Sequence, residues 1–302
     1  MVEKESITIG WIGTGVMGYS MCNHLLSNGY KILVSNRTMS KAQGLIDLGA
    51  KQSDPISIAK QADFLFIMLG YPKDVEEMTI CPDKGIIKYM KKGAYLIDHT
   101  TSSPSLAEKI YQEAKKFSVY SYDAPVTGGD VGAKNGKLVT MVGGDKEHFE
   151  PLEKLLNIYS KSLLLTGGAG LGQHTKMVNQ IMIANKIIGT CEGVLYAYKA
   201  GLDVEKTFNL LSQGAASSFQ ITSYFPRINV RDFEPGFYAE HFFKDMGIAL
   251  EECKRMNLEL KGLELAYSFY DIMMKEGLGR KGHHGILLVL EKLNKVIVES
   301  KK

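Results

Sequence analysis

Residues 7–18 are ITIGWIGTGVMG, a short apolar run followed at once by a G-x-G-x-x-G pattern at Gly13, Gly15 and Gly18. The run is typical of a buried strand, and residues 16–27 are typical of a helix. In this context the first glycine permits a tight turn, the second lets the backbone approach a pyrophosphate, and the third lets the helix pack against the strand. The helix N-terminus stabilises the phosphate charge. The segment therefore predicts a dinucleotide-binding βαβ unit.

The alternation of strand and helix patterns continues to about residue 142. We predict strands at residues 7–12, 31–35, 64–69, 95–98, 119–124 and 138–142, with helices between them such as 16–27 and 105–117. Such alternation indicates a Rossmann-type α/β fold with a parallel, doubly wound sheet.

Strand patterns disappear after the glycine-rich segment at residues 167–172. Helical patterns follow at residues 175–200, 204–213, 242–256, 262–276 and 285–299. The first is apolar nearly all round, which is typical of a helix buried among others. We therefore predict an NAD(P)-binding Rossmann domain at residues 1–165 and an all-helical substrate and dimerisation domain at residues 166–302.

Composition excludes several classes of function. The chain has 302 residues and a formal net charge of +3, with its basic residues scattered, so no nucleic-acid partner is expected. The four cysteines are far apart and form no metal-spaced cluster with the seven histidines, so no metal is expected. No signal peptide and no membrane-spanning run is recognisable, and we expect a cytoplasmic protein without a membrane partner.

The end of the second predicted strand bears on cofactor choice. NAD-preferring sites usually place an acidic residue there, whereas an Arg nearby accommodates the 2′-phosphate of NADP. Here the acid is absent, and Asn36, Arg37 and Thr38 follow the strand. Arg37 could be a solvated loop residue, but together the two observations favour NADP(H) over NAD(H).

Two further segments suggest a substrate site. Thr127, Gly128 and Gly129 offer a hydroxyl and accessible backbone N–H groups, which suit a small carboxylate, although a simple β-turn explains them equally well. Lys176, Asn179 and Gln180 are spaced to share one face of a predicted buried helix. A protonated Lys176 could donate to the alkoxide that forms when an aldehyde is reduced. The alternative is a lysine whose ammonium extends to solvent.

Five segments together resemble the β-hydroxyacid dehydrogenase family, which includes 3-hydroxyisobutyrate dehydrogenase, tartronate semialdehyde reductase and the glyoxylate/succinic semialdehyde reductases. In chain order they are GWIGTGVMG at 10–18, IDHTT at 97–101, DAPVTGG at 123–129, GLGQHTK at 170–176 and KD at 244–245. The resemblance covers nearly the whole chain. It implies an NAD(P)-dependent dehydrogenase or semialdehyde reductase that acts on a small carboxylate substrate as a homodimer or homotetramer.

The resemblance also implies residue roles. Lys176 is expected to be the catalytic acid/base, and Thr127, Gly128 and Gly129 are expected to bind the substrate carboxylate. Lys244, which by local pattern belongs to an exposed charge pair with Asp245, is expected to reach the nicotinamide end of the cofactor. The expected cofactor-binding residues are Gly13, Thr14, Gly15, Val16, Met17, Gly18, Asn36, Arg37, Thr38, Leu69, Gly70, Thr101 and Lys244.

Two departures from the family pattern leave alternatives open. Most relatives carry a substrate-orienting Asn four residues after the lysine, where this chain has Gln180, so either Asn179 or Gln180 could take that role. The segment with Arg280, Lys281, His283 and His284 replaces a stretch that carries an Asp in many relatives. It could line the mouth of the substrate site or form a basic surface turn.

Three other activities compete with this interpretation. Imine reductases share the fold but usually replace the lysine. A decarboxylating phosphogluconate dehydrogenase has a much longer helical domain. A non-catalytic NADP-binding scaffold is the third alternative, and such a protein would be expected to lose the lysine.

Overall fold

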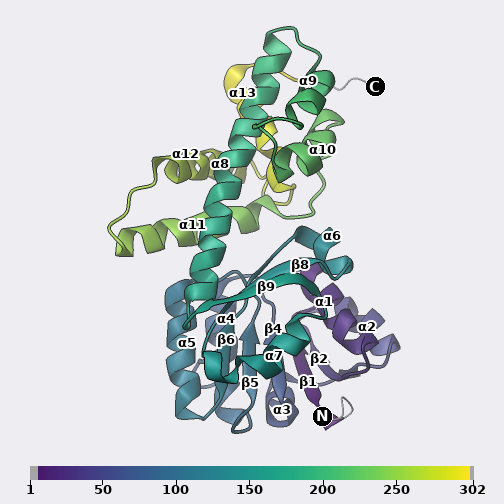
Figure 1. Ribbon diagram of the computed structural model, residues 1–302, viewed down its shortest axis with the longest axis vertical. Helices are drawn as coiled ribbons and strands as arrows, with labels where there is room; N and C mark the ends of the chain where they lie inside the picture. The colour runs from purple at the N-terminus through teal and green to yellow at the C-terminus, as the bar shows by residue number, and fades with distance from the viewer. Residues whose placement is uncertain (1–5, 300–302) are drawn as a thin grey trace. The chain divides into compact units, whose positions relative to one another are not determined.

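The computed structural model describes residues 6–299 (Figure 1). The described residues up to Lys176 form one unit, and those from Met177 onward form a second. The predicted domain limits, 1–165 and 166–302, stay a prediction. Residues 1–5, which belong to the segment examined for a signal peptide, lie outside the described residues.

The first unit alternates strands and helices along the chain. Its elements are β1 (Thr8–Ile12), α1 (Val16–Ser27), β2 (Lys31–Ser35), α2 (Gln43–Asp47), β3 (Lys51–Gln52), α3 (Pro55–Gln61), β4 (Phe64–Ile67), α4 (Pro72–Thr79), β5 (Tyr95–Asp98), α5 (Pro104–Lys116), β6 (Tyr120–Asp123), β7 (Val126–Thr127), α6 (Gly129–Lys134), β8 (Leu138–Gly143), α7 (Phe149–Leu156) and β9 (Ser160–Gly167).

These strands form one sheet, which has nine strands within residues 6–299 and the order β3-β2-β1-β4-β5-β6-β8-β7, with β9 paired to β8. The pairs from β3 to β6 are all parallel. Alternate side chains of the strands face two cores. Ile9 and Trp11 belong to the core that α1, α2 and α7 cover, and Ile12 belongs to the core that α3, α4 and α5 cover. The prediction of a doubly wound α/β sheet is therefore confirmed.

The far edge of the sheet departs from the prediction. β8 runs antiparallel to β6 and β7, so it does not continue the parallel order. The strand β9 was not predicted, although its leucines at 163–165 were an available signal, because most of its residues are exposed or half-buried. In the parallel part of the sheet, β4 ends at Ile67, two residues earlier than predicted, because the Leu69 N–H turns away to bond the Thr100 hydroxyl.

The second unit is helical. The long helix α8 (Leu171–Lys199) begins in the first unit and continues into the second. The helices that follow are α9 (Val204–Leu211), α10 (Phe225–Asn229), α11 (Ala239–Arg255), α12 (Lys261–Lys275) and α13 (Ile286–Asn294). Their apolar faces bury one core that includes Phe208, Phe242 and Tyr270. The predicted all-helical region is therefore confirmed.

The predicted helix at residues 285–299 is too long. Helix α13 ends at Asn294, and Lys295 has a left-handed φ of 52°. The chain beyond it is held by other bonds instead: Arg231 donates to the Val298 carbonyl, and the Val298 N–H donates to the Glu291 carboxylate. Within residues 6–299, no helix combines the length and apolar character that crossing a bilayer requires.

Candidate active site

The glycine turn after β1 has the geometry that the sequence pattern predicts. Gly13 has a φ of +101°, and a Cβ there would lie 2.1 Å from the Met68 carbonyl oxygen. A Cβ at Gly18 would lie 2.1 Å from the Gly13 carbonyl oxygen, so only glycine lets α1 begin this close to the strand. A Cβ at Gly15 would meet no atom within 4 Å, which leaves open space beside the backbone.

The start of α1 fits a bound pyrophosphate. Gly15 is its N-cap, no side chain caps its first N–H groups, and its first turn carries no acidic residue. The Thr14 hydroxyl is buried and has no hydrogen-bond partner within residues 6–299. Free N–H groups, the positive end of the helix dipole and an unsatisfied hydroxyl together suit an anionic ligand.

The predicted cofactor residues of the first unit follow the carboxyl ends of neighbouring parallel strands. Residues 13–18 follow β1, residues 36–38 follow β2, Leu69 and Gly70 follow β4, and Thr101 follows β5. Carboxyl ends of parallel strands meet at one edge of a sheet, and the order reverses between β1 and β4. Such a switch point is where doubly wound folds bind their ligands.

The loop after β2 is held by Asn36. Its side-chain oxygen accepts a bond from the Thr14 N–H at 2.9 Å, and its side-chain nitrogen donates to the Thr38 carbonyl at 2.7 Å. Asn36 thereby ties the glycine turn to the β2 loop, and the neighbouring Arg37 is exposed.

The predicted carboxylate-binding residues form a tight turn. β7 ends at Thr127, which is half-buried. Gly128 and Gly129 have φ values of 127° and 67°, a conformation that side chains disfavour.

Lys176 lies beside this turn. Its side chain is buried, with 6% of the residue exposed, and its Nζ donates to the Val126 carbonyl oxygen at 2.9 Å. Val126 directly precedes Thr127, so the structure brings Lys176 and the predicted carboxylate-binding residues together within the first unit. The burial contradicts the alternative in which the Lys176 ammonium extends to solvent.

Asp123 is a site residue that local sequence reasoning missed. Its carboxylate is buried and accepts bonds from the Gly170 N–H at 2.8 Å and the Gln173 N–H at 2.7 Å, at the first turn of α8. Burial raises the pKa of Asp123 to about 7, and the backbone N–H donors of Gly170 and Gln173 oppose that rise. No signal near residue 123 in the sequence indicates that this carboxylate caps a helix 47 residues away.

In the second unit, Asn179, Gln180, Lys244 and Asp245 form one polar network. Asn179 donates to the Gln180 side-chain oxygen at 2.6 Å, and Gln180 donates to the Asp245 carboxylate at 2.6 Å. Lys244 Nζ lies 3.1 Å from the other Asp245 oxygen. The Lys244 and Asp245 side chains are only 13% and 2% exposed, so the interpretation of an exposed charge pair is wrong. Asp245 is buried because it lies on the same side of helix α11 as the buried Phe242 and Met246.

Within the basic segment at residues 280–284, the arginine and the two histidines have different environments. Arg280 is exposed, pairs with Glu240 and lies over the Tyr238 ring, as a surface turn requires. His283 and His284 are instead buried among aromatic rings such as Tyr224. For the two histidines, the prediction of a surface turn and the prediction that they line the mouth of the site are therefore both wrong. Burial lowers the pKa of His283 to about 3.

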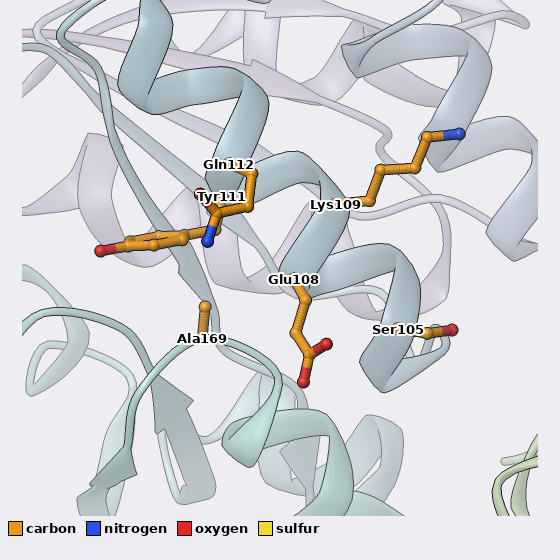
Figure 2. Close-up of a pocket in the computed structure, with 6 residues that line it drawn as sticks. All are labelled: Ser105, Glu108, Lys109, Tyr111, Gln112 and Ala169. Carbon is orange, nitrogen blue, oxygen red and sulfur yellow. The ribbon is translucent and has the colours of Figure 1, made fainter. Parts of the chain in front are cut away.

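A pocket of about 490 Å³ lies elsewhere on the first unit, between α5 and the segment before α8. Figure 2 shows Glu108 and Tyr111 on α5 and Ala169 on that segment. None of the predicted cofactor or substrate residues is among the residues that line it, which are Ser105, Glu108, Lys109, Tyr111, Gln112 and Ala169. Among residues 6–299 no group of three or more His, Cys, Asp or Glu side chains is arranged to hold a metal.

Comparison with known proteins identifies the family of the chain. Residues 8–168 match the NAD-binding domain of 6-phosphogluconate dehydrogenase, and residues 170–290 match the NAD-binding domain of NADP-dependent 3-hydroxyisobutyrate dehydrogenase. The chain is 48% identical to a probable mitochondrial 3-hydroxyisobutyrate dehydrogenase-like protein of Arabidopsis thaliana, over 99% of this chain and 90% of the relative. It is 31% identical to the 2-hydroxy-3-oxopropionate reductase of Escherichia coli, over 94% of this chain and 97% of that enzyme.

A solved structure shares the fold. The 3-hydroxyisobutyrate dehydrogenase of Mycobacterium tuberculosis superposes with a TM-score of 0.85 at 24% identity, covering 94% of this chain and 99% of that one. The chain belongs to the β-hydroxyacid dehydrogenase family, and it is an NAD(P)-dependent oxidoreductase of the hydroxyacid dehydrogenase type.

Proposed function

We propose that the enzyme transfers a hydride between a nicotinamide cofactor and a short β-hydroxy acid or its semialdehyde acid, with Lys176 as the acid/base. The observation that carries the proposal is the buried Lys176 ammonium, held 2.9 Å from the Val126 carbonyl beside Thr127. A buried lysine is costly unless its charge is used or compensated. The names of the relatives, which include 2-hydroxy-3-oxopropionate reductase, support an acid substrate of this size.

The chemistry of the lysine follows from its position. The nicotinamide, when bound, supplies or accepts the hydride. As negative charge develops on the aldehyde oxygen, Lys176 Nζ donates a proton to it, and in the reverse direction the neutral amine takes the hydroxyl proton. The bond to Val126 orients the ammonium and uses one of its three N–H donors.

Thr127, Gly128 and Gly129 bind the substrate carboxylate in this proposal. The positive φ values of the two glycines turn the backbone where no side chain projects. One hydroxyl and the backbone N–H groups then offer charge-assisted bonds to the carboxylate. Because these donors lie next to the Lys176 ammonium, the carboxylate and the reacting carbonyl are separated by only a few carbons.

Two proposals concern the cofactor. NADP(H) is preferred because Arg37 is exposed on the loop that Asn36 holds after β2, where no acidic residue stands. Lys244 also binds the cofactor, with Asp245 fixing its ammonium at 3.1 Å.

Between the two amides of α8, Asn179 is the one that orients the substrate. Gln180 is buried, and its donor is committed to Asp245. Asn179 is partly exposed, and its donated bond to Gln180 fixes which way its own carbonyl oxygen points. Gln180 therefore acts as the support of Asn179.

The competing functions leave the buried lysine without a role. An imine reductase or a non-catalytic scaffold gains nothing from a desolvated ammonium beside a carboxylate-binding turn, and removing it would relieve the cost of burial. The expected cytoplasmic location and the homodimer or homotetramer stay predictions.

The experiment that tests the proposal compares an acid with a neutral aldehyde. With NADPH, kcat/KM for succinic semialdehyde is expected to exceed that for butanal by at least about two decades, because butanal leaves the donors of residues 127–129 without a carboxylate partner. Thr127→Val is expected to weaken only the acid, mainly through KM. Similar kcat/KM values for both aldehydes would show that residues 127–129 are only a turn.

A further inference from the structure

The first turn of α8 is fixed to the ends of two strands. The Asp123 carboxylate at the end of β6 accepts the N–H groups of Gly170 and Gln173 with one oxygen each. A Cβ at Gly172 would lie 2.5 Å from the Asp123 carbonyl oxygen, and one at Gly143 would lie 2.5 Å from Asp123 Oδ1. The helix therefore begins in direct backbone contact with β6 and β8, and the carboxylate sets its position along the strand.

Gln173 fixes the same turn to the loop after β5. Its side chain is fully buried, its oxygen accepts the Ser102 N–H at 3.0 Å, and its nitrogen donates to the Thr100 carbonyl at 2.7 Å. These two bonds bracket Thr101, which is a proposed cofactor residue. One glutamine thereby holds the peptide groups on both sides of Thr101.

Lys176 follows Gln173 by three residues, which is about one helical turn and a rise of about 4.5 Å. Its ammonium returns to the Val126 carbonyl, three residues after Asp123. The contacts thus form a closed path from Asp123 to the first turn of α8, on to Lys176, and back to the chain beside Thr127.

We propose that Asp123 and Gln173 are positioning residues that set the Lys176 ammonium relative to the loops of Thr101 and Thr127. The inference rests on the proposed role of Lys176 as the proton donor. Neither side chain needs to touch the substrate, because both act on the helix that carries the lysine.

Loss of this positioning is expected to slow turnover. A displacement of about 1 Å in a catalytic group costs about two decades in rate. Gln173→Met keeps the length and the apolar stem but removes both side-chain bonds, and it is expected to lower kcat by about 10-fold to 100-fold. Asp123→Asn retains one acceptor for the two N–H groups and is expected to lower kcat by about 10-fold.

The test is a double-mutant cycle between Gln173→Met and Lys176→Met, with kcat measured on succinic semialdehyde and NADPH. If Gln173 acts through the lysine, Gln173→Met lowers kcat by about 10-fold or more in the wild type but by less than about 3-fold in the Lys176→Met background. Tyr111→Phe is the matched control, because it removes side-chain bonds to Asp145 in the same unit without involving α8. Its kcat is expected to stay unchanged.

The outcomes separate the two proposals. If Lys176→Met lowers kcat but Gln173→Met costs the same factor in both backgrounds, the positioning role is overturned and the proposed function stands. A decrease in kcat for Tyr111→Phe equal to that for Gln173→Met also overturns it, because any lost tertiary bond would then suffice. If Lys176→Met keeps a near-normal kcat, the lysine mechanism and the inference both fail. Should Gln173→Met not fold, Asp123→Asn takes its place in the same cycle.

Discussion

Replacement of Arg37 by Ala is expected to remove most of the preference for NADPH over NADH. Arg37 lies on the exposed loop after β2, and the adjacent Asn36 holds that loop through Thr14 and Thr38. The loop is therefore already ordered, and a contact to the 2′-phosphate needs only the Arg37 side chain to be fixed. Hydrogen bonds to charged groups contribute about 1.5–3 kcal/mol, and solvent exposure favours the lower part of that range.

A contribution of about 1.5–2 kcal/mol corresponds to about 10-fold to 30-fold in kcat/KM. We expect Arg37→Ala to lower kcat/KM for NADPH by this factor and to leave the value for NADH unchanged. The preference of the wild type should also decrease as salt is added, because exposed charges are screened over about 8–10 Å.

Lys41→Ala provides the control, since Lys41 is a second exposed cation on the turn that follows the same loop. For Lys41→Ala, the ratio of kcat/KM with NADPH to kcat/KM with NADH is expected to change by less than about 3-fold, because a general electrostatic effect at an exposed site is weak. A wild-type enzyme that uses NADH as well as NADPH would refute the reasoning. So would an Arg37→Ala variant with the wild-type ratio.

Three further predictions concern the lysine, the amides and pH. Lys176→Met should lower kcat by about two to four decades while the cofactor Kd, measured by fluorescence titration, stays constant; near-normal turnover would require another proton donor. Asn179→Ala should lower kcat/KM for the acid with little change in Tm, whereas Gln180→Ala should lower Tm because it removes the hydrogen-bond donor of one oxygen of the buried Asp245 carboxylate; equal Tm losses would contradict this division. Because the lowered pKa of His283 keeps its ring neutral in the folded state, the contribution of His283 to the free energy of unfolding is fully present above about pH 6.5. Below that pH this contribution falls by about 1.4 kcal/mol per pH unit, down to about pH 3. Urea unfolding at pH 7 and pH 5 measures this, and His283→Phe should reduce the difference between the two free energies.

Much of the first unit could be predicted because its signals are local. The strand, glycine turn and helix at residues 7–27 depend on neighbours within a few positions, and steric limits at Gly13 and Gly18 leave no other residue type. The spacing of Lys176 and Asn179 on one helix is equally local. Local patterns of this kind predicted the doubly wound sheet and the helical region that follows it.

The contacts that complete the site are long-range, and periodicity carries no information about them. Helix α8 begins at Leu171 rather than at 175, where its own pattern begins, because the Asp123 carboxylate caps it from 47 residues away. Lys244 and Asp245 resemble a solvated pair in sequence, yet Asp245 is buried against Gln180, 65 residues earlier in the chain. The adjacent histidines at 283 and 284 are in the core because aromatic rings from other helices enclose them. A side chain's burial and partners depend on which segments pack together, and that packing is decided only when the whole chain folds.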